Sequence, residues 1–424
     1  MPSAVVVAAL VLLALAARDD DTAPRRAVDA TQTPAPLDGV ARRIGPAGLR
    51  EHLVALQRIA DEHGGDRAAG SPGERATADY VAGRLEAAGY RVAVEEVAVP
   101  AFRERSAPRL SAGSRSYAAR TMRFSGSGTV AGTVRDAGLG CAPAALAPLR
   151  RGEVALIRRG TCTFREKALA AERAGAAAVL IADDEPVRGS LQRAGVRLPV
   201  LAVGASAAGL AGERVRIAVD ATSTIRRSPS VIAEMGAAGA RRVVIAGGHL
   251  DSVPAGPGLN DNGSGVAALL EIAEELGGRR VPDGTALRFA FWGAEEVGLV
   301  GSRRYVARLS RAERRRIAAY LNLDMVGSPG AEPAVYDGDA AIEAALRGRL
   351  GADAPQRDLG GSSDHAPFAA AGIPVGGIFT GLDDCYHERC DRLDNVDRAV
   401  LTRSARAAGA ALVDLTRVSR RRRP

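Results

Sequence analysis

Residues 243–251 read Val243-Val244-Ile245-Ala246-Gly247-Gly248-His249-Leu250-Asp251. The apolar first half predicts a buried strand, and the later apolar run from Val266 to Leu276 predicts a helix. From Val231 onward, strands and helices alternate along the chain, which is typical of an α/β sheet. Because functional groups of open α/β sheets gather beyond the carboxyl ends of strands, we expect His249 to lie in a functional site.

The residues before this stretch show two different patterns. Helical spacing over residues 49–60 predicts one helix, a second is predicted from Gly73 to Ala88, and residues 92–99 predict a strand. Residues 106–224 instead contain one clear helix among short predicted strands, at Thr129 to Val134, Val154 to Ile157, Ala177 to Ile181 and Val215 to Val219. We therefore expect an insert at 106–224 that interrupts one α/β domain, whose two parts span residues 45–105 and 225–416.

The composition excludes several classes of protein. The chain has 424 residues, of which 46% are hydrophobic and 25% charged, so neither wholesale disorder nor a polytopic membrane protein is expected. Only 4% of the residues are aromatic, which argues against a nucleic-acid surface built on stacking. The net charge is +8, and five of these charges belong to a predicted basic tail at 417–424, in Arg417 and Arg420 to Arg423. We therefore expect no nucleic-acid partner, although weak attachment of the tail to an anionic cell surface is an alternative.

The N-terminal residues predict export. Ala4 to Ala17 form an apolar run that is shorter than the roughly 20 residues of a membrane-spanning helix. Ala14-Leu15-Ala16 supplies the small residues that signal peptidase requires. We predict a signal peptide at 1–17, a linker or propeptide at 18–44, and a secreted, extracellular protein without stable membrane insertion after cleavage. An uncleaved anchor is the alternative.

Acidic residues follow three predicted strands, the first being the strand at 243–246, which Asp251 follows. Glu295 and Glu296 come after the apolar strand that ends at Trp292, and Asp324 follows the strand that ends at Leu323. Adjacent carboxylates at the end of a buried strand repel each other unless a cation or solvent compensates them. Asp261 lies in the Gly- and Asn-rich turn 258–265, which by itself could be a helix cap or a phosphate cradle.

Together these residues predict a metal site. With His387 from the stretch Cys385 to Asp391, a set of five ligands could hold two metal ions: His249, Asp261, Glu296, Asp324 and His387. Mixed imidazole and carboxylate ligation suits zinc, and two such ions can activate water and polarise a carbonyl group. Glu295 is then free to act as general base. Asp251 could hold the imidazole of His249 through its second nitrogen.

At this point the sequence resembles a known family, the M28 di-zinc aminopeptidases, and in particular the secreted actinobacterial leucine aminopeptidases. Several blocks in the family's order carry the resemblance: His249-Leu250-Asp251-Ser252-Val253, Asn260-Asp261-Asn262-Gly263-Ser264-Gly265, Glu295-Glu296, Asn322-Leu323-Asp324-Met325, Ser363-Asp364-His365-Ala366-Pro367-Phe368, Gly377-Ile378-Phe379-Thr380-Gly381 and Tyr386-His387. The resemblance implies a mixed, mostly parallel central sheet flanked by helices. It also implies hydrolysis of the N-terminal residue from peptides with a free N-terminus.

The resemblance further assigns roles to the site residues. Asp261 would bridge two Zn²⁺ ions, with His249 and Asp324 on one ion and Glu296 and His387 on the other. Glu295 would activate the bridging hydroxide and protonate the leaving amine, and Tyr386 would hydrogen-bond the oxyanion.

The resemblance also concerns substrate binding. Met325 and Phe379 would line an apolar pocket for a Leu-like side chain, while Glu295 and Asp324 would receive the free amino group. Relatives often carry Arg where this chain has Ser362, which leaves the docking of the substrate open. His365 is expected to be structural.

The insert has its own resemblance. The stretches 159–167 and 174–181 look like a protease-associated (PA) domain, with Ala168, Leu169 and Ala171 on the inward face of a helix. The insert could shape access to the active site or be passive. Four cysteines allow three pairings; the domain assignment and the resemblance favour Cys385–Cys390 and Cys141–Cys162, and export favours disulfides over zinc ligation.

Other functions remain open on the sequence alone. A carboxypeptidase-like relative would share the metal set and the insert, but it would carry a longer helical region after Val400. A non-catalytic binding protein would not need all five ligands, Glu295 and Tyr386, and a one-zinc glutaminyl cyclase would not require the fifth ligand. We expect a monomeric aminopeptidase.

Overall fold

The computed structural model describes residue 37 and residues 39–417. The predicted signal peptide, most of the predicted linker and the tail beyond Arg417 lie outside these residues. Within the described part of the chain, no helix is both long and apolar enough to cross a membrane.

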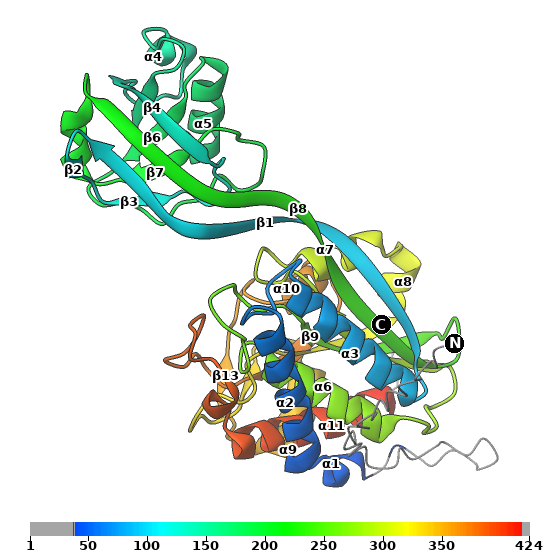
Figure 1. The fold of residues 1–424 in the computed structure, drawn as a ribbon. Helices are drawn as coiled ribbons and strands as arrows, with labels where there is room; N and C mark the ends of the chain where they lie inside the picture. The colour runs from blue at the N-terminus through cyan, green and yellow to red at the C-terminus, as the bar shows by residue number, and fades with distance from the viewer. Residues whose placement is uncertain (1–36, 38, 418–424) are drawn as a thin grey trace, which may run out of the picture. The chain divides into compact units, whose positions relative to one another are not determined.

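A mixed sheet forms the centre of the α/β domain (Figure 1). Its central strand, β9 (Arg242–His249), lies between β10 and β11 and runs parallel to both. β14 is parallel to β11, whereas β12 and β8 pair in the antiparallel direction with β14 and β10. The strands are β8 (Arg214–Gly236), β10 (Thr285–Trp292), β11 (Ile317–Leu323), β12 (Ala334–Tyr336), β13 (Gln356–Arg357) and β14 (Val375–Phe379). The expected mixed, mostly parallel sheet is confirmed.

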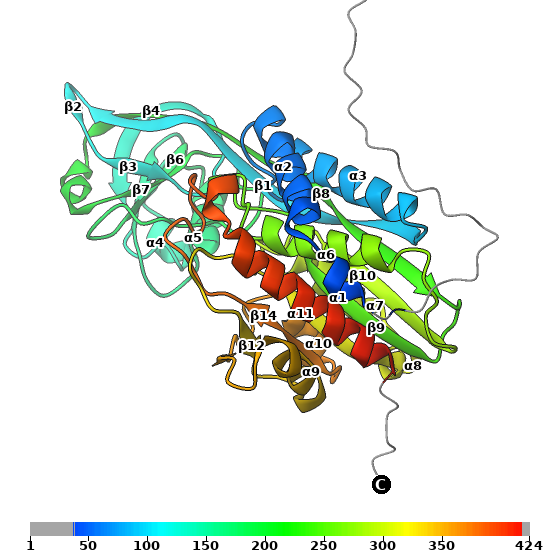
Figure 2. The same ribbon diagram turned by 90° about the horizontal axis from the view of Figure 1, so that it is seen from below.

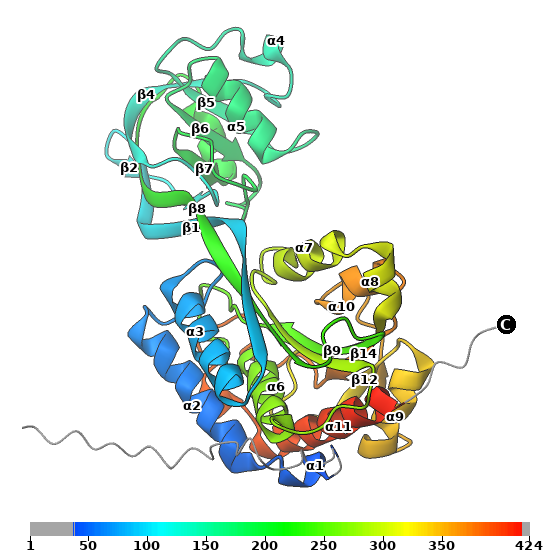
Figure 3. The same cartoon turned by 90° about the vertical axis from the view of Figure 1, so that its right-hand side faces the viewer.

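Helices cover both faces of this sheet (Figures 2 and 3). Side chains alternate along a strand, so Val244 and Ala246 of β9 join one apolar cluster while Val243 and Ile245 join another. The first cluster includes residues of α1 (Val40–Arg43), α2 (Pro46–Glu62), α3 (Pro72–Ala87), α6 (Gly263–Leu276), α9 (Ala340–Leu350) and α11 (Arg398–Arg417). The second face carries α7 (Val300–Arg308), α8 (Arg311–Arg316) and α10 (His365–Ala370). A strand that is buried on both faces explains the continuous apolar run at 243–246.

The predicted helices and most predicted strands are confirmed, but two strands are far longer than expected. β1 (Arg91–Ala112) has 22 residues and β8 has 23, and the predicted strand Val215 to Val219 is only one end of β8. The two strands pair with each other from Arg91 opposite Glu234 to Ala112 opposite Val215, with register shifts near Ser106. Because each strand satisfies the other's backbone groups, both continue where their side chains are exposed and the sequence shows no apolar pattern. The predicted domain boundaries fall inside these strands.

The insert is a second layered unit. Its parallel strands β4, β5, β6 and β7 follow in that order, with β8 antiparallel to β4 and β3 antiparallel to β7. Their bounds are β3 (Ala119–Thr121), β4 (Gly128–Asp136), β5 (Val154–Arg158), β6 (Ala178–Ala182) and β7 (Val200–Val203), and the shorter elements of the insert are β2 (Arg115–Ser116), α4 (Pro143–Leu146) and the 3-10 turn η1 (Ala205–Leu210). A second 3-10 turn, η2 (Leu393–Asn395), belongs to the α/β domain and precedes α11. The helix α5 (Phe164–Arg173) buries Ala168 and Ala171 and half-buries Leu169, as predicted.

Both disulfides form as expected. Cys141 is bonded to Cys162 within the insert, and Cys385 is bonded to Cys390 in the loop after β14.

Candidate active site

The register of the sheet brings the predicted site residues to one edge. His249 is the last residue of β9 and lies opposite Trp292, the last residue of β10. Asn322 of β11 lies opposite Gly247, so Asp324 reaches the level of His249. Three carboxyl strand ends therefore present their side chains to the same space, as the sequence predicted.

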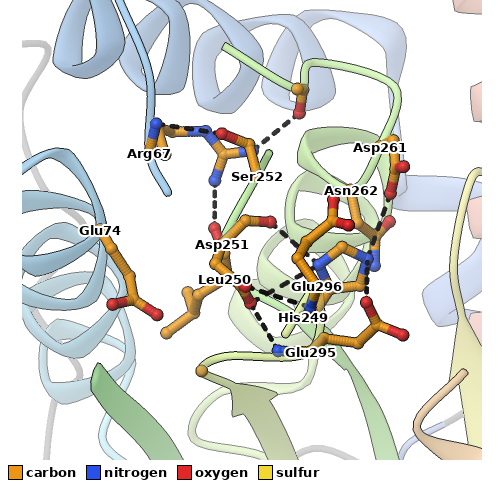
Figure 4. A network of polar contacts seen from close by, with 12 residues as sticks. Arg67, Glu74, His249, Leu250, Asp251, Ser252, Asp261, Asn262, Glu295 and Glu296 are labelled. Atoms are coloured by element: carbon orange, nitrogen blue, oxygen red, sulfur yellow. Dashed lines mark hydrogen bonds and ion pairs between the residues drawn. The ribbon is translucent and has the colours of Figure 1, made fainter. Parts of the chain in front are cut away.

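Asp261 occupies the centre of the cluster, between two histidines. Its Oδ1 lies 3.2 Å from Nε2 of His249, and its Oδ2 lies 3.2 Å from Nε2 of His387. His249 Nε2 is also 3.3 Å from Oδ1 of Asp324, and His387 Nε2 is 3.1 Å from Oε2 of Glu296. Each histidine thus shares Asp261 and has one further acid of its own, so the five predicted ligands come together. Figure 4 shows His249, Asp261, Glu295 and Glu296 in this arrangement.

The donor set fits two zinc ions. Around a tetrahedral zinc with bonds of about 2.0–2.1 Å, ligand atoms stand roughly 3.3 Å apart, which matches the 3.1–3.3 Å separations here. Two buried carboxylate oxygens, Oε1 of Glu296 and Oδ1 of Asp324, have no hydrogen-bond partner. Buried acceptors of this kind require a partner, and a cation would supply one.

The electrostatics of the cluster show the same need for positive charge. Burial raises the pKa of Glu296 to about 7, against the hydrogen bond from His387. Hydrogen bonds to Asp261 and Glu296 raise the pKa of His387 to about 10. Burial opposes ionisation of Asp261, but its bonds to the two histidines hold the pKa of that carboxyl well below its usual range. The buried carboxylates of the cluster therefore need positive charge among them, which metal ions would supply.

Glu295 stands beside this ligand set without joining it. Its Oε2 is 4.0 Å from Nε2 of His249, farther than the carboxylates of Asp261 and Asp324. Burial raises the pKa of Glu295 to about 10; His249 opposes this shift, while the acids Asp364 and Asp324 add to it. The carboxylate is therefore positioned for proton transfer next to the ligands.

Asp251 holds the imidazole of His249 through its second nitrogen as expected, and it does so with its backbone carbonyl. Nδ1 of His249 donates to the backbone carbonyl oxygen of Asp251 at 2.9 Å, whereas the carboxylate oxygen is 3.8 Å away. The carboxylate instead accepts hydrogen bonds from the backbone N–H groups of Glu295, at 3.0 Å, and Glu296, at 3.2 Å. The carbonyl fixes the tautomer that leaves Nε2 of His249 free as a ligand, and the carboxylate orients the loop with the two glutamates (Figure 4).

Asn262 explains the Gly- and Asn-rich turn before α6. Its Oδ1 accepts from the backbone N–H of Gly265 at 2.9 Å and so caps the helix, while its Nδ2 donates to the carbonyl of Leu323 at 2.9 Å. A Cβ on Gly265 would lie 2.3 Å from both Asn262 Oδ1 and the carbonyl oxygen of Leu323. The turn needs glycine there because α6 approaches the end of β11 closely, which holds Asp261 near Asp324.

Asp391 is a supporting residue to which the sequence analysis assigned no role. It is buried, and its carboxylate accepts from the backbone N–H groups of Asn260, at 2.7 Å, and Asp261, at 3.0 Å. It directly follows the Cys385–Cys390 disulfide, which closes the loop that carries His387. The loop that supplies His387 therefore also positions Asp261. In the sequence, the position of Asp391 directly after Cys390 was the only sign of this role.

Arg67 was missed altogether. It lies between α2 and α3, is fully buried, and donates to the backbone carbonyls of Leu250, Pro257, at 2.8 Å, and Gly258, at 2.7 Å (Figure 4). Its charge faces several buried acids, Asp251, Asp391, Asp261 and Glu74. One guanidinium thus holds both ends of the loop that connects His249 to Asp261. It belongs to no local motif, so the sequence offered no signal.

The predicted substrate-binding residues border the cluster. Tyr386 is 37% exposed and stacks on His387, with 3.8 Å between ring centroids. Met325 is buried directly after Asp324, and its carbonyl accepts from the N–H of Thr380, the neighbour of half-buried Phe379. Nε2 of His365 donates to the carbonyl of Gly360 at 3.0 Å, and His365 is not among the residues that cluster as metal ligands within the described chain.

Known proteins share this sequence and fold. Residues 230–412 match the model of peptidase family M28, and residues 127–211 match the PA domain. A probable lipoprotein aminopeptidase of Mycobacterium tuberculosis, LpqL, is 36% identical over 85% of this chain and 82% of its own length. The chain belongs to peptidase family M28. An aminopeptidase of Pseudomonas aeruginosa is 33% identical, over 86% of this chain and 79% of its own.

Solved structures of the M28 type agree with this assignment. The aminopeptidase from Aneurinibacillus sp. strain AM-1 superposes with a TM-score of 0.70 and 29% identity, covering 88% of this chain and 94% of its own. BSAP, a zinc aminopeptidase from Bacillus subtilis, gives 0.66 and 26% identity, covering 88% of this chain and 96% of its own. The protein is an M28 metallo-aminopeptidase with an inserted PA domain, as its sequence predicted.

Substituting Arg67→Met should destabilise the protein by about 3–5 kcal/mol, because buried acids and three carbonyl groups lose their partner. Aminopeptidase activity should fall with it, since the loops that carry His249 and Asp261 lose their common anchor. Urea unfolding and a rate assay measure both effects. The control is Arg91→Met, which removes an exposed pair with Glu234 and should cost no more than about 1 kcal/mol. Equal losses in the two variants would contradict the role of Arg67.

Proposed function

We propose that the protein removes a large apolar, Leu-like residue from the free N-terminus of peptides outside the cell, using two zinc ions. The observation that carries this proposal is the placement of Asp261, whose two carboxylate oxygens each face a different histidine at 3.2 Å. A single ion would not require an acid shared between two separate sets of donors. His249 and Asp324 would hold one ion, and Glu296 and His387 the other.

When bound, the ions would polarise the scissile carbonyl group and lower the pKa of the attacking water. Glu295 takes the proton from that water and passes it to the leaving amine, for which its place beside the ligands suits it. Its backbone N–H is held by Asp251, so the carboxylate is oriented before the substrate arrives. Tyr386, exposed beside His387, donates its hydroxyl hydrogen to the oxyanion that forms on the substrate.

The requirement for a free N-terminus follows from the acids at the cluster. A protonated α-amino group needs carboxylate acceptors, and Glu295 and Asp324 offer them next to the reacting atoms. Oδ2 of Asp324 accepts from the hydroxyl of Ser363 at 2.7 Å, which fixes its orientation. The same pair disfavours peptides whose terminus is blocked and uncharged.

The preference for an apolar first residue rests on Met325 and Phe379. Neither side chain belongs to the apolar clusters of the sheet. Met325 is buried directly after Asp324 and Phe379 is half-buried, and apolar side chains beside a catalytic cluster are typical of a substrate pocket.

Secretion is supported by the two disulfides, since such bonds persist in oxidising compartments.

The proposal predicts that Leu-p-nitroanilide is cleaved and that N-acetyl-Leu-p-nitroanilide is cleaved at least about 100-fold less efficiently. The acetyl group removes the charged hydrogen bonds of the amine, each of which contributes about 1.5–3 kcal/mol. A chelator should abolish cleavage, and added zinc should restore it. Equal kcat/KM for the two substrates would refute recognition of the free N-terminus.

Substituting Glu295→Gln should lower kcat by about 10²- to 10⁴-fold while zinc remains bound, because the amide cannot accept the proton. Elemental analysis measures the zinc content beside the rate. Glu388→Gln, which changes an exposed carboxylate on the loop of His387, is the control and should keep its activity. Loss of zinc from the Glu295 variant would make Glu295 a ligand instead.

Substituting Met325→Phe should shift the preference toward smaller first residues, because the larger, stiffer ring fills part of the pocket. The ratio of kcat/KM for Leu- over Ala-p-nitroanilide should fall by about tenfold, within the range of 1–3 kcal/mol for a tightened apolar pocket. Val94→Phe, on the exposed side of β1, is the control. An unchanged ratio would remove Met325 from the pocket.

A further inference from the structure

A second group of potential metal ligands lies away from the catalytic cluster. His52 of α2 faces Glu271 and Glu274 of α6, and one ligand atom from each lies within 4.8 Å of the others. Glu271 stands about 12 Å along the helix axis from Gly263, where α6 begins beside the catalytic turn. The group therefore shares a helix with the active site but none of its residues.

His52 points an unpartnered nitrogen at the two glutamates. The side chain is fully buried, and its Nδ1 is bonded to the hydroxyl of Tyr80 at 2.8 Å. Its Nε2 has no hydrogen-bond partner and lies 3.9 Å from Oε2 of Glu271 and 3.9 Å from Oε1 of Glu274. These separations are too long for hydrogen bonds. Burial, together with Arg84, lowers the pKa of His52 to about 3, so the imidazole is neutral and can serve as a ligand.

The acids around His52 carry more charge than their protein partners balance. Arg84 donates to Glu274 at 2.6 and 2.7 Å and also pairs with Glu51, while Glu275 has its own partner in Arg43. Glu51 and Glu274 thus share one guanidinium, and within the described residues no arginine pairs with Glu271, which leaves two negative charges. Burial raises the pKa of Glu271 to about 6, against a hydrogen bond from the N–H of Gly45. A divalent cation would balance this charge.

The carboxylate of Glu271 is also built into the helix packing. A Cβ on Gly48 of α2 would lie 2.0 Å from Oε2 of Glu271, so glycine there lets the carboxylate keep this position. Oε1 of the same group is bonded to Gly45, which leaves Oε2 facing His52. The glycine at position 48 thus leaves space for Oε2 of Glu271, which faces the imidazole of His52.

We infer that His52, Glu271 and Glu274 form a separate binding site for a zinc-like divalent ion that fastens α2 to α6. One imidazole nitrogen with two carboxylate oxygens is a donor set for zinc rather than for calcium or magnesium, which prefer oxygen alone. An inward shift of each donor by a few tenths of an ångström brings the 3.9 Å separations to the roughly 3.3 Å found around zinc. Oε1 of Glu274 can accept from Arg84 and still present a second lone pair to the ion.

The ion would have a structural role. α6 begins at the cap Asn262, next to Asp261, and His52 lies on the helix that precedes Arg67. Fastening α2 to α6 far from the chemistry would hold in place the two segments that carry Asp261 and Arg67.

The test is zinc content after the purified full-length protein is stripped with a chelator, reloaded with zinc chloride and desalted. His52→Asn keeps a polar atom near the hydroxyl of Tyr80 but removes Nε2, and Glu271→Gln removes the charge. Each should bind one zinc fewer per chain than the wild type and should melt at a lower temperature in zinc. His63→Gln changes another histidine at the end of α2, outside the group, and should bind as much zinc as the wild type.

A crystal of the zinc-loaded wild type decides the question without any variant. An anomalous difference peak at the zinc edge is expected within bonding distance of His52 Nε2. The absence of a peak there, or equal zinc content in His52→Asn and the wild type, would overturn the inference. A proton shared among the acids, and not a metal ion, would then reduce their negative charge. The active-site ions contribute equally to all of these proteins, so an error in the proposed two-ion catalytic site would not change the difference.

Discussion

The active site depends on one electrostatic constraint, the gathering of carboxylates at a single buried edge of a parallel sheet. Glu295, Glu296 and Asp324 follow strands that end side by side, and Asp261 is brought among them by the turn before α6. Buried like charges raise one another's pKa, as they do at Glu295, unless positive charge is supplied. His249 and His387 can supply part of this charge. The Nε2 atom of each histidine faces a different oxygen of Asp261, so each could bind a metal ion together with that carboxylate.

Around this core, the remaining polar groups act on the backbone rather than on the ligands. Asp251 holds the N–H groups of Glu295 and Glu296, Asp391 holds that of Asp261, and Arg67 holds three carbonyls of the intervening loops. The bonds of Asp391 and Arg67 are buried and those of Asp251 are part-buried, where a polar group without a partner is costly. The ligand-bearing loops are therefore fixed by the folded protein itself, so that metal binding requires little reorganisation.

The sequence pointed to most of the candidate ligands because they lie in local patterns. An apolar strand followed by an acid, or a Gly- and Asn-rich turn before a helix, reflects interactions within a few residues, and the family resemblance ordered these pieces. Sequence patterns did not reveal residues whose contacts lie far away in the chain. Arg67 contacts backbone atoms more than 180 positions away, and backbone atoms have no side-chain identity for a motif to record. The lengths of β1 and β8 were missed for the same reason, since their mutual pairing supports strands whose side chains are exposed.

The amino-acid sequence by itself determined the α/β class, the insert and the family, because hydrophobic period and short-range chemistry encode them, and it also supplied the candidate metal ligands. The tertiary structure alone decided how those groups meet: that Asp261 lies between two histidines, that the carbonyl of Asp251 rather than its carboxylate orients His249, and that His52 faces two glutamates from another helix. Distances between segments far apart in the chain arise from strand register and helix packing, and these are properties of the whole folded domain.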